Sequence, residues 1–341
     1  MPECPSVCTP QCTNCDKSQF QVRHRTLEKR FLPKFNILKH LSHDHKMAGQ
    51  TLVPNVCSVF REDLFHDKVA IVTGGGTGIG KTITQELLHL GCKVMIASRK
   101  VERLKKAVTE LKSTISRSSL ADIDYLQCNI RNEDEVKNLM SQTIKQFGGI
   151  NFLVNNGGGQ FPSGAGDIRL KGWNAVVETN LTGTFLCCRE VFNQWFKDHG
   201  GVIVNIIVDN FKGFPLMSHS GAARAGVENL TKSLSIEWAE YGVRINSVAP
   251  GGGIYSETAA ANYANPTMIQ SSIPRVPAKR NGTTEEISAS VCFLLSPAAT
   301  FISGETLRVD GGASLYKNKY EIPEHNKLPG YTWEKDLSSK L

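Results

Sequence analysis

The sequence of 341 residues contains no apolar run that approaches the ~20 residues a membrane-spanning helix requires, which argues against an integral membrane protein. Its first residues also lack the basic-then-apolar pattern of a secretory signal. Ten cysteines are present, but they do not form the spaced framework of a disulfide-bonded secreted domain. We therefore expect a reducing compartment. Five cysteines lie in or beside apolar segments, where free cysteine behaves as a small hydrophobic residue: Cys92, Cys128, Cys187, Cys188 and Cys292.

A strong charge of either sign is also missing. The formal net charge is +7, and part of this mild excess lies in residues 1–46. Such a surface fits a small polyanionic ligand such as a nucleotide, and no segment resembles a nucleic-acid-binding motif. The hydrophobic content of 40% is enough for one large α/β core or two modest domains.

The first 46 residues differ from the rest of the chain because cysteines and basic residues are crowded there. The last two of four early cysteines have CxxC spacing, but structural zinc sites usually pair two such sets and no second set follows. We therefore predict no metal site, and an N-terminal extension over 1–65 that is disordered at least to 46. The alternatives are translation from an upstream start and a mitochondrial presequence, which the acidic residues disfavour. The cysteines are Cys4, Cys8, Cys12 and Cys15.

From residue 68 onward, β-branched apolar runs alternate with helical segments. In 132–147 the apolar residues recur at helical spacing, and Asn132 with Glu135 resembles a capping box at its start. The pattern predicts one doubly wound, Rossmann-type α/β domain over 66–316, followed by a polar tail at 317–341. Seven near-continuous apolar runs are typical of a parallel sheet covered on both faces: 69–72, 94–97, 123–127, 152–154, 202–207, 244–248 and 307–309.

The first predicted strand runs directly into "TGGGTGIG" and then into a helical segment. Glycines at this point allow a tight turn and let backbone amides approach a pyrophosphate, and the helix dipole favours the anion. A string of glycines alone would be weak, but between a strand and a helix it is specific. We predict cofactor contacts from Thr73, Gly74, Thr77, Gly78, Ile79 and Gly80.

The second predicted strand ends in Ser98, Arg99 and Lys100. A carboxylate at this point usually holds the free ribose 2′-hydroxyl of NADH, whereas a guanidinium can clamp the 2′-phosphate of NADPH. The sequence therefore favours NADPH as the cofactor. The alternative is that Arg99 and Lys100 form a solvated helix start.

These features together resemble the short-chain dehydrogenase/reductase superfamily. "NNGG" at 155–158, "ETNLTGTF", "APG" at 249–251 and "VDGG" at 309–312 follow the glycine motif in the order of that family. The resemblance implies a homo-oligomer, commonly a tetramer. An extra glycine after the Pro-Gly motif is a departure in the loop expected to cover the nicotinamide. The implied cofactor contacts are Asn129, Ile130, Asn156, Gly157, Gly158, Arg224, Pro250, Gly251, Ile254 and Thr258.

The expected active site departs from the superfamily's pattern. The family reduces carbonyls with a tyrosine acid, a lysine four residues later and an orienting serine. Counting back from the Pro-Gly motif places Arg224 at the lysine position and Ser220 at the tyrosine position, within "HSGAARAG". Val208 replaces the orienting serine, and Asn180 matches the family's helix asparagine. The catalytic residues expected from this register are Asn180, Ser220 and Arg224.

A second register with the same spacing, Glu228 and Lys232, lies one helical turn too late. In the favoured register, a ketone would be reduced poorly, because the alkoxide needs a proton donor and neither serine nor arginine is a suitable acid. Conjugate reduction of an enoyl thioester instead develops charge on an enolate oxygen, which needs hydrogen-bond donors. Ser220, Asn156, backbone amides and His219 are possible donors, with Arg224 fixing the ribose.

The atypical site has a counterpart, because "SRKxERL", "NNGGGQF", "VNIIV", "HSGAARAGV" and "VCFLLSPAA" are similar to the peroxisomal trans-2-enoyl-CoA reductase family. That resemblance implies an oxidoreductase acting on CH–CH groups, which saturates the C2–C3 double bond of enoyl-CoA with NADPH in fatty acid metabolism. Two alternatives stay open: a reductase of 2,4-dienoyl-CoA or ketones, and a non-catalytic NADPH-binding protein.

The chain ends in Ser339, Lys340 and Leu341, the tripeptide read by the peroxisomal import receptor. We therefore expect a peroxisomal protein. Binding the phosphates of coenzyme A would require basic side chains at the mouth of the site. Lys279 and Arg280 are candidates, or else ordinary surface charges.

Overall fold

Seven parallel strands form a single sheet in the computed structural model, which describes residues 58–116, 119–254, 271–316, 322–331 and 333. The strand order is β3-β2-β1-β4-β5-β6-β7, so the predicted doubly wound α/β fold is confirmed. Each predicted apolar run falls on one strand. The strands are β1 (Val69–Thr73), β2 (Lys93–Ser98), β3 (Ile123–Gln127), β4 (Phe152–Asn155), β5 (Gly201–Ile206), β6 (Val243–Pro250) and β7 (Thr306–Val309).

The predictions for the four N-terminal cysteines, for Thr258 and for the tripeptide Ser339–Leu341 lie outside the described residues. Within the described residues, no helix is both long and apolar enough to span a membrane.

Helices fill the crossovers between the strands. One continuous helical run crosses 170–199 and contains two π-helical turns, η2 (Glu178–Thr182) and η3 (Phe192–Phe196). The α-helices are α1 (Gly78–His89), α2 (Val101–Lys112), α3 (Glu133–Phe147), α4 (Leu170–Val177), α5 (Gly183–Val191), α6 (Lys197–His199), α7 (Ser218–Glu237) and α10 (Thr284–Leu295). Short 3₁₀ turns are η1 (Ala165–Asp167), η4 (Ala239–Tyr241), η5 (Ile273–Arg275) and η6 (Pro297–Ala299).

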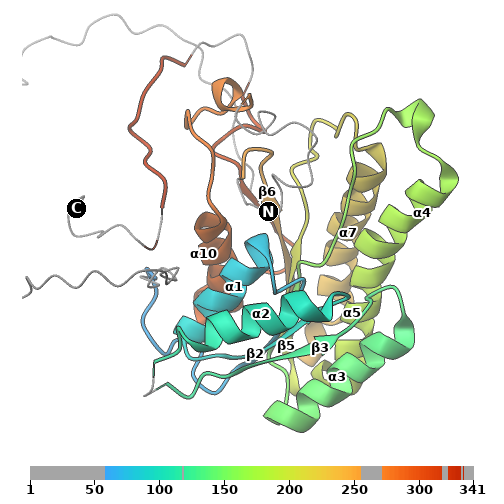
Figure 1. Ribbon diagram of the computed structural model, residues 1–341, viewed down its shortest axis with the longest axis vertical. Coiled ribbons are helices and arrows are strands. Elements are labelled where there is room, and N and C mark those ends of the chain that lie inside the picture. The colour runs from blue at the N-terminus through green and yellow to red at the C-terminus, as the bar shows by residue number, and fades with distance from the viewer. Residues whose placement is uncertain (1–57, 117–118, 255–270, 317–321, 332, 334–341) are drawn as a thin grey trace, which may run out of the picture. The chain divides into compact units, whose positions relative to one another are not determined.

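Both faces of the sheet are buried because successive side chains of a strand point to opposite faces. Ala70 and Val72 of β1 join one hydrophobic cluster with α1, α2 and α10, while Ile71 joins the other with α3, α5 and α7. Figure 1 shows α1 and α10 lying together on one side, with α5 and α7 on the other. This two-sided burial explains why the strands are apolar runs rather than alternating ones.

The start of α3 differs from the predicted capping box. The side chain of Asn132 accepts the backbone N–H groups of Asp134 and Glu135, as an N-cap should. However, the carboxylate of Glu135 accepts the N–H of Asn129 at 2.7 Å, instead of the N–H of Asn132. The N–H of Asn132 is already bonded to the carbonyl of Asn129, so the reciprocal half of the box is replaced by a contact to the end of β3.

The strand order reverses between β1 and β4, which places a crevice at the carboxyl ends of the central strands. Thr73, Asn155, Asn205 and Ser247 are in register across β1, β4, β5 and β6. The loops that follow these residues carry the glycine turn, the "NNGG" segment, Val208 and the Pro-Gly motif. The fold therefore gathers the predicted cofactor residues at one edge of the sheet.

Candidate active site and cofactor site

The turn after β1 requires its glycines. Gly74 and Gly78 have φ angles of +67° and +50°, which glycine adopts without a steric cost. A Cβ on Gly80 would lie 2.3 Å from the carbonyl oxygen of Gly74, so a side chain there would push α1 away from β1. Helix α1 begins at Gly78, and its first N–H groups have no partner within the helix. This is the arrangement that binds a pyrophosphate.

A set of short hydrogen bonds joins the turn after β1 to the turn after β4. The Thr73 hydroxyl accepts the N–H groups of Asn156 and Gly157 at 3.1 and 2.9 Å. The Asn156 amide donates to the carbonyls of Thr73 and Gly74. Both amide hydrogens of Asn156 are thus used to hold the cofactor cradle. In this structure Asn156 therefore holds the glycine turn and offers no free amide hydrogen to a substrate oxygen.

The side chains expected to hold the adenosine half lie around the ends of β2 and β3. Arg99 and Lys100 are exposed, and no ion pair to either is seen within the described part of the chain. The amide oxygen of Asn129 accepts the N–H and Nε–H of Arg131. Ile130 is buried against Gly183 of α5, where a Cβ would lie 2.7 Å from its Cγ1. These residues form the wall of the crevice beside the glycine turn.

Asn180 lies in the π-helical turn η2, fully buried. Its Oδ1 accepts the N–H of Gly159 at 2.9 Å, and its Nδ2 donates to the Gly159 carbonyl at 3.0 Å. The same Nδ2 lies 3.4 Å from the Ser220 hydroxyl. π-Helical turns are rare and occur frequently at functional sites. Here the turn brings Asn180 against both the "NNGG" segment and α7.

Ser220 lies on the first turn of α7 and is buried. Its hydroxyl donates to Oε1 of Gln160 at 2.8 Å. Gln160 is a member of this site that the sequence does not predict. A glutamine that follows a glycine-rich segment has no spacing that marks it as functional.

Arg224 is buried one turn further along α7, with 8% of its surface exposed. Its Nη1 donates to the carbonyl of Ile206 at the end of β5, and its Nε has no hydrogen-bond partner among the described residues. A Cβ on Gly158 would lie 2.1 Å from Nη2. Burial lowers the pKa of Arg224 to about 10, so the group is still protonated at neutral pH. The site thus holds a buried cation that no described carboxylate neutralises.

The structure distinguishes the two registers considered for α7. Glu228 and Lys232 form an ion pair with each other at 3.1 Å on the solvent side of the helix. Both are partly exposed, and among the described residues neither bonds to Asn180, whereas Ser220 does. The earlier register, with Ser220 and Arg224, is therefore the one that faces the crevice.

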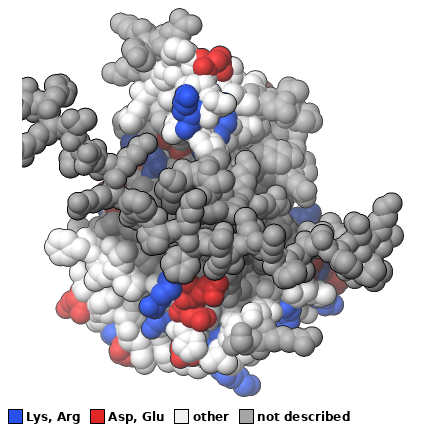
Figure 2. Space-filling view, turned by 90° about the vertical axis from the view of Figure 1, so that its left-hand side faces the viewer, with Lys and Arg blue, Asp and Glu red and all other residues white. Residues whose placement is uncertain are grey.

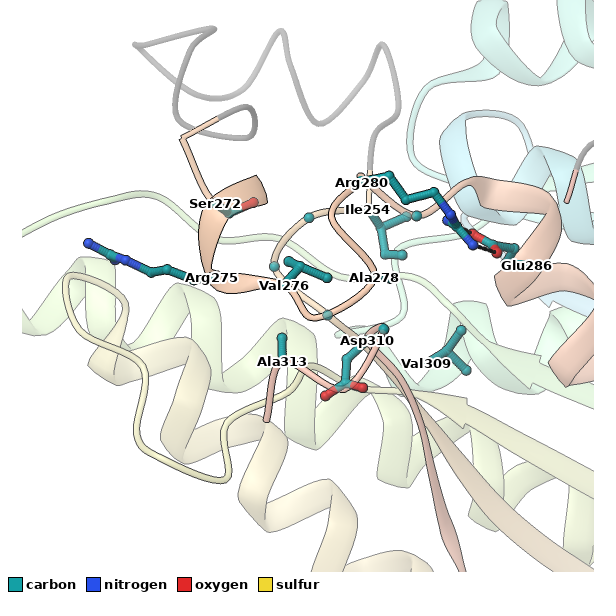
Figure 3. A pocket seen from close by; sticks show the side chains of 15 residues that line it. Ile254, Ser272, Arg275, Val276, Ala278, Arg280, Glu286, Val309, Asp310 and Ala313 are labelled. Atoms are coloured by element: carbon teal, nitrogen blue, oxygen red, sulfur yellow. Dashed lines mark hydrogen bonds and ion pairs between the residues drawn. The ribbon is translucent and has the colours of Figure 1, made fainter. Parts of the chain in front are cut away.

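A cavity of about 250 Å³ lies between the loop after β6, which includes Gly251, the segment 272–286 and the turn after β7. Ile254, which we expected near the nicotinamide, lines it and forms a β-bridge with Gly282. Figure 3 shows the Ile254 side chain at the cavity and the Arg275 side chain extending away from it. The extra glycine of the loop, Gly252 or Gly253, lies in this wall.

Lys279 and Arg280, candidates for binding coenzyme A, are engaged elsewhere. Arg280 forms a two-fold ion pair with Glu286, drawn in Figure 3, and donates to the carbonyls of Leu328 and Pro329. Lys279 pairs with Glu324 at 3.1 Å. Both side chains therefore attach the segment 322–331 to the domain, which is a structural role.

Metal and thiol chemistry find little support in the described residues. No group of three or more His, Cys, Asp or Glu side chains is placed there to hold a metal ion. Burial raises the pKa of Cys128 and Cys188 to about 12, so these thiols stay protonated at neutral pH. The free, buried state predicted for Cys92, Cys128, Cys187, Cys188 and Cys292 is confirmed.

A parallel sheet with a glycine-rich turn at its switch point, facing a buried Asn–Ser–Arg cluster, defines a nucleotide-dependent oxidoreductase of the Rossmann type. The family model described as "Enoyl-(Acyl carrier protein) reductase" matches residues 74–314. The chain belongs to the short-chain dehydrogenase/reductase family. Its cofactor is thus a nicotinamide nucleotide, NAD(H) or NADP(H).

Known relatives agree with this assignment. The chain is 35% identical over 269 residues to the peroxisomal 2,4-dienoyl-CoA reductase [(3E)-enoyl-CoA-producing] of Danio rerio, covering 75% of this chain and 85% of the relative. The Rattus norvegicus protein of the same name is 36% identical over 262 residues, covering 75% and 86%. Among solved structures, a citronellol catabolism dehydrogenase of Pseudomonas aeruginosa PAO1 is 43% identical, with a TM-score of 0.66, covering 75% of this chain and 99% of that one.

Proposed function

We propose that the protein uses NADPH to reduce a double bond conjugated to the thioester of an enoyl-CoA, with trans-2-enoyl-CoA as substrate. The observation that supports this best is the composition of the Asn180–Ser220–Arg224 cluster. It combines hydrogen-bond donors with a buried cation, and no tyrosine stands at the acid position. Such a cluster suits an enolate oxygen better than an alkoxide, because the enolate needs electrostatic stabilisation more than an immediate proton.

The residues present fit a dinucleotide, since Gly80 keeps the cradle open and the charge of Arg224 is not neutralised. Bound NADPH would supply hydride to the β-carbon of the alkene. Arg224 would fix the ribose and raise the local positive potential. Ser220, which is hydrogen-bonded to Gln160 and Asn180, would orient the acyl group. Asn180 would keep the Gly159 backbone in place. The α-carbon would take its proton from water or a hydroxyl.

Arg99 is the group we propose to bind the 2′-phosphate of NADPH, with Lys100 beside it. Replacing Arg99 by Asp should raise the Kd for NADPH about 100-fold, because charge-assisted hydrogen bonds are lost and a like charge is introduced. NADH binding should change far less. Fluorescence titration of both cofactors measures this. Lys105→Asp, an exposed charge on helix α2, which begins two residues after Arg99, is the control. Equal losses for NADPH and NADH would show that Arg99 does not bind the phosphate.

A second candidate, 2,4-dienoyl-CoA, is favoured by the names of the relatives. Both substrates develop charge on the same thioester oxygen, but they accept hydride at different carbons. Saturating trans-2-enoyl-CoA places hydride on C3, whereas converting a 2,4-dienoyl group to a 3-enoyl group places hydride on C5 and the proton on C2.

Deuterium-labelled NADPH distinguishes these reactions in one experiment. The protein is offered trans-2-enoyl-, 2,4-dienoyl- and 3-ketoacyl-CoA of several chain lengths, and the label is located in the product by NMR. Label at C3 of a saturated acyl group supports the first proposal, and label at C5 supports the second. Turnover of the ketone alone would eliminate both. Tight NADPH binding without any turnover would identify a non-catalytic cofactor-binding protein.

We also propose a peroxisomal location, supported by the C-terminal Ser-Lys-Leu and by the relatives named peroxisomal. A fluorescent protein fused at the N-terminus should enter peroxisomes with this ending and remain outside when Leu341 is removed. A homotetramer is proposed from the family, and light scattering of the purified protein tests it.

A further inference from the structure

His219 is an unusual buried side chain beside the candidate active site. It lies on the first turn of α7, next to Ser220, and its surface is 0% exposed. Neither Nδ1 nor Nε2 has a hydrogen-bond partner among the described residues. A neutral imidazole carries one donor and one acceptor, so both go unsatisfied.

An arrangement of this kind costs folding free energy, because a buried polar group without a partner loses its hydration and gains nothing in return. A leucine or phenylalanine would fill the same space without that cost. Packing alone therefore does not explain why residue 219 is a histidine rather than an apolar residue. An unpaired buried group in a folded protein calls for an explanation, and a catalytic role is one of those known.

The loop after β4 connects this ring to the site. Gln160 and Phe161 are consecutive, and they contact the consecutive residues Ser220 and His219. The Phe161 ring lies edge-on to the imidazole, with centroids 4.5 Å apart and an interplanar angle of 74°. Phe161 is 39% exposed and rests against Gly172 of α4, where a Cβ would lie 2.9 Å from its Cζ. An apolar side chain reaching the surface thus covers one side of the histidine.

The neighbouring uncharged donors are already used. Both amide hydrogens of Asn156 bind the glycine turn. The Asn180 amide donates to Gly159 and Ser220, and the Ser220 hydroxyl donates to Gln160. Beside these donors, the ring nitrogens of His219 have no hydrogen-bond partner among the described residues, so its imidazole N–H binds nothing.

We propose that His219 is a further catalytic residue, whose ring N–H donates a hydrogen bond to the thioester oxygen when the acyl chain displaces Phe161. This rests on the proposed function, an enoyl thioester as substrate. The proton stays on the ring throughout, so the imidazole stabilises the enolate charge and transfers nothing. Phe161 keeps the ring dry in the free protein and offers an apolar surface to the acyl chain.

The test compares His219→Leu and His219→Gln with the wild-type protein. The leucine variant should lose about 100-fold in kcat, the usual effect of removing one oxyanion donor. The Kd for NADPH should not change, and the melting temperature should stay equal or rise, because an unsatisfied buried group is removed. The glutamine variant keeps an N–H donor and should recover part of kcat. His199→Leu, an exposed histidine on α6 bonded to the Trp195 carbonyl, is the control and should keep full activity.

Two results would overturn the proposal. One is a leucine variant with wild-type kcat. The other is a leucine variant in which melting temperature and NADPH binding fall together with activity, which would make the histidine structural. Should the leucine variant not fold, His219→Phe replaces it in the same comparison. A wild-type protein that turns over no enoyl thioester would overturn the proposed function as well, whereas turnover with an unaffected variant would overturn the role of His219 alone.

Discussion

At the scale of single residues, the site depends on how closely backbone and side chains approach one another. Arg224 can lie against the "NNGG" segment because residue 158 has no side chain. The same absence leaves room for Oδ1 of Asn180, which a Cβ on Gly158 would approach to 2.9 Å. Gly158 is therefore a steric requirement of the Asn180–Arg224 pair rather than a flexible hinge.

Replacing Gly158 by Ala should displace the guanidinium of Arg224 and reduce kcat/KM about 10- to 100-fold, because small misplacements of catalytic groups are costly. Steady-state kinetics with enoyl-CoA measures the effect. Gly159→Ala is a matched control, since a Cβ on Gly159 meets nothing within 4 Å. If both variants keep wild-type kinetics, the close approach of Arg224 to residue 158 has no catalytic importance.

At the scale of elements, buried polar bonds position α7 against the sheet. Asn155 of β4 donates to Asn205 of β5, and Asn205 donates to Thr231 of α7. Thr231 also bonds to Ser247 of β6 at 2.8 Å. Because these bonds join three strands to one helix, they set the rotation of α7 and so direct Ser220 toward Asn180. A network of this kind specifies one packing arrangement.

Helices α1 and α10 pack around a buried carboxylate, Glu86. It accepts the hydroxyls of Ser58 and Ser288, yet burial raises its pKa above the ordinary value of 4.5. A raised folded-state pKa means that the folded protein binds the proton more tightly than the unfolded chain. This contribution to stability is full below pH 4.5 and is lost as the pH rises through the folded-state pKa.

Glu86→Gln should therefore raise the melting temperature at about pH 8 by roughly 2–4 °C and much less at about pH 4, below the ordinary pKa of 4.5. The amide keeps an acceptor for the serine hydroxyls and carries no charge to bury. Thermal unfolding across this pH range provides the measurement, with the exposed Glu102→Gln on α2 as control. If Glu86→Gln shifts the melting temperature by the same amount at both pH values, Glu86 is not the titrating group.

At the scale of the whole molecule, charged side chains of both signs are interspersed on the face shown in Figure 2. Some of the exposed charges form ion pairs: Lys112 of α2 pairs with Asp122, and Lys137 pairs with Glu133 on α3.

The bonds of Lys279 and Arg280 have a different role, because they join the domain to the segment 322–331. The hydroxyl of Thr283 adds a bond to the Tyr331 carbonyl. The segment 322–331 is therefore attached to the segment 272–286, which lines the cavity.

Arg280→Gln should release the segment 322–331 and speed tryptic cleavage after the exposed Lys327 about tenfold, because the bonds to Leu328 and Pro329 are lost. Mass spectrometry of timed digests identifies the site. Arg275→Gln, which also removes a tryptic site and lies on the same loop, is the control. Equal cleavage rates in the two variants would mean that Arg280 does not hold the segment.

The sequence by itself determined the elements and the cofactor cradle, because both depend on local patterns. Apolar runs of strand length predicted all seven strands, and the glycine spacing predicted the turn between β1 and α1. Counting back from the Pro-Gly motif also placed Ser220 and Arg224 at the tyrosine and lysine positions of the family, and the structure has both on α7. Only the tertiary structure decided which hydrogen-bond donors of the active site are free to bind a ligand.

Gln160 bonds to a serine 60 residues away, and Asn156 bonds to Thr73, 83 residues away. The unpaired state of His219 and the solvent-facing Glu228–Lys232 pair likewise depend on how α7 packs. Hydrogen bonds between distant segments leave no periodic trace in a sequence, since either partner can be any polar residue. The sequence therefore predicted Asn180, Ser220 and Arg224 but not Gln160, and packing settled which side chains are bonded and which are free.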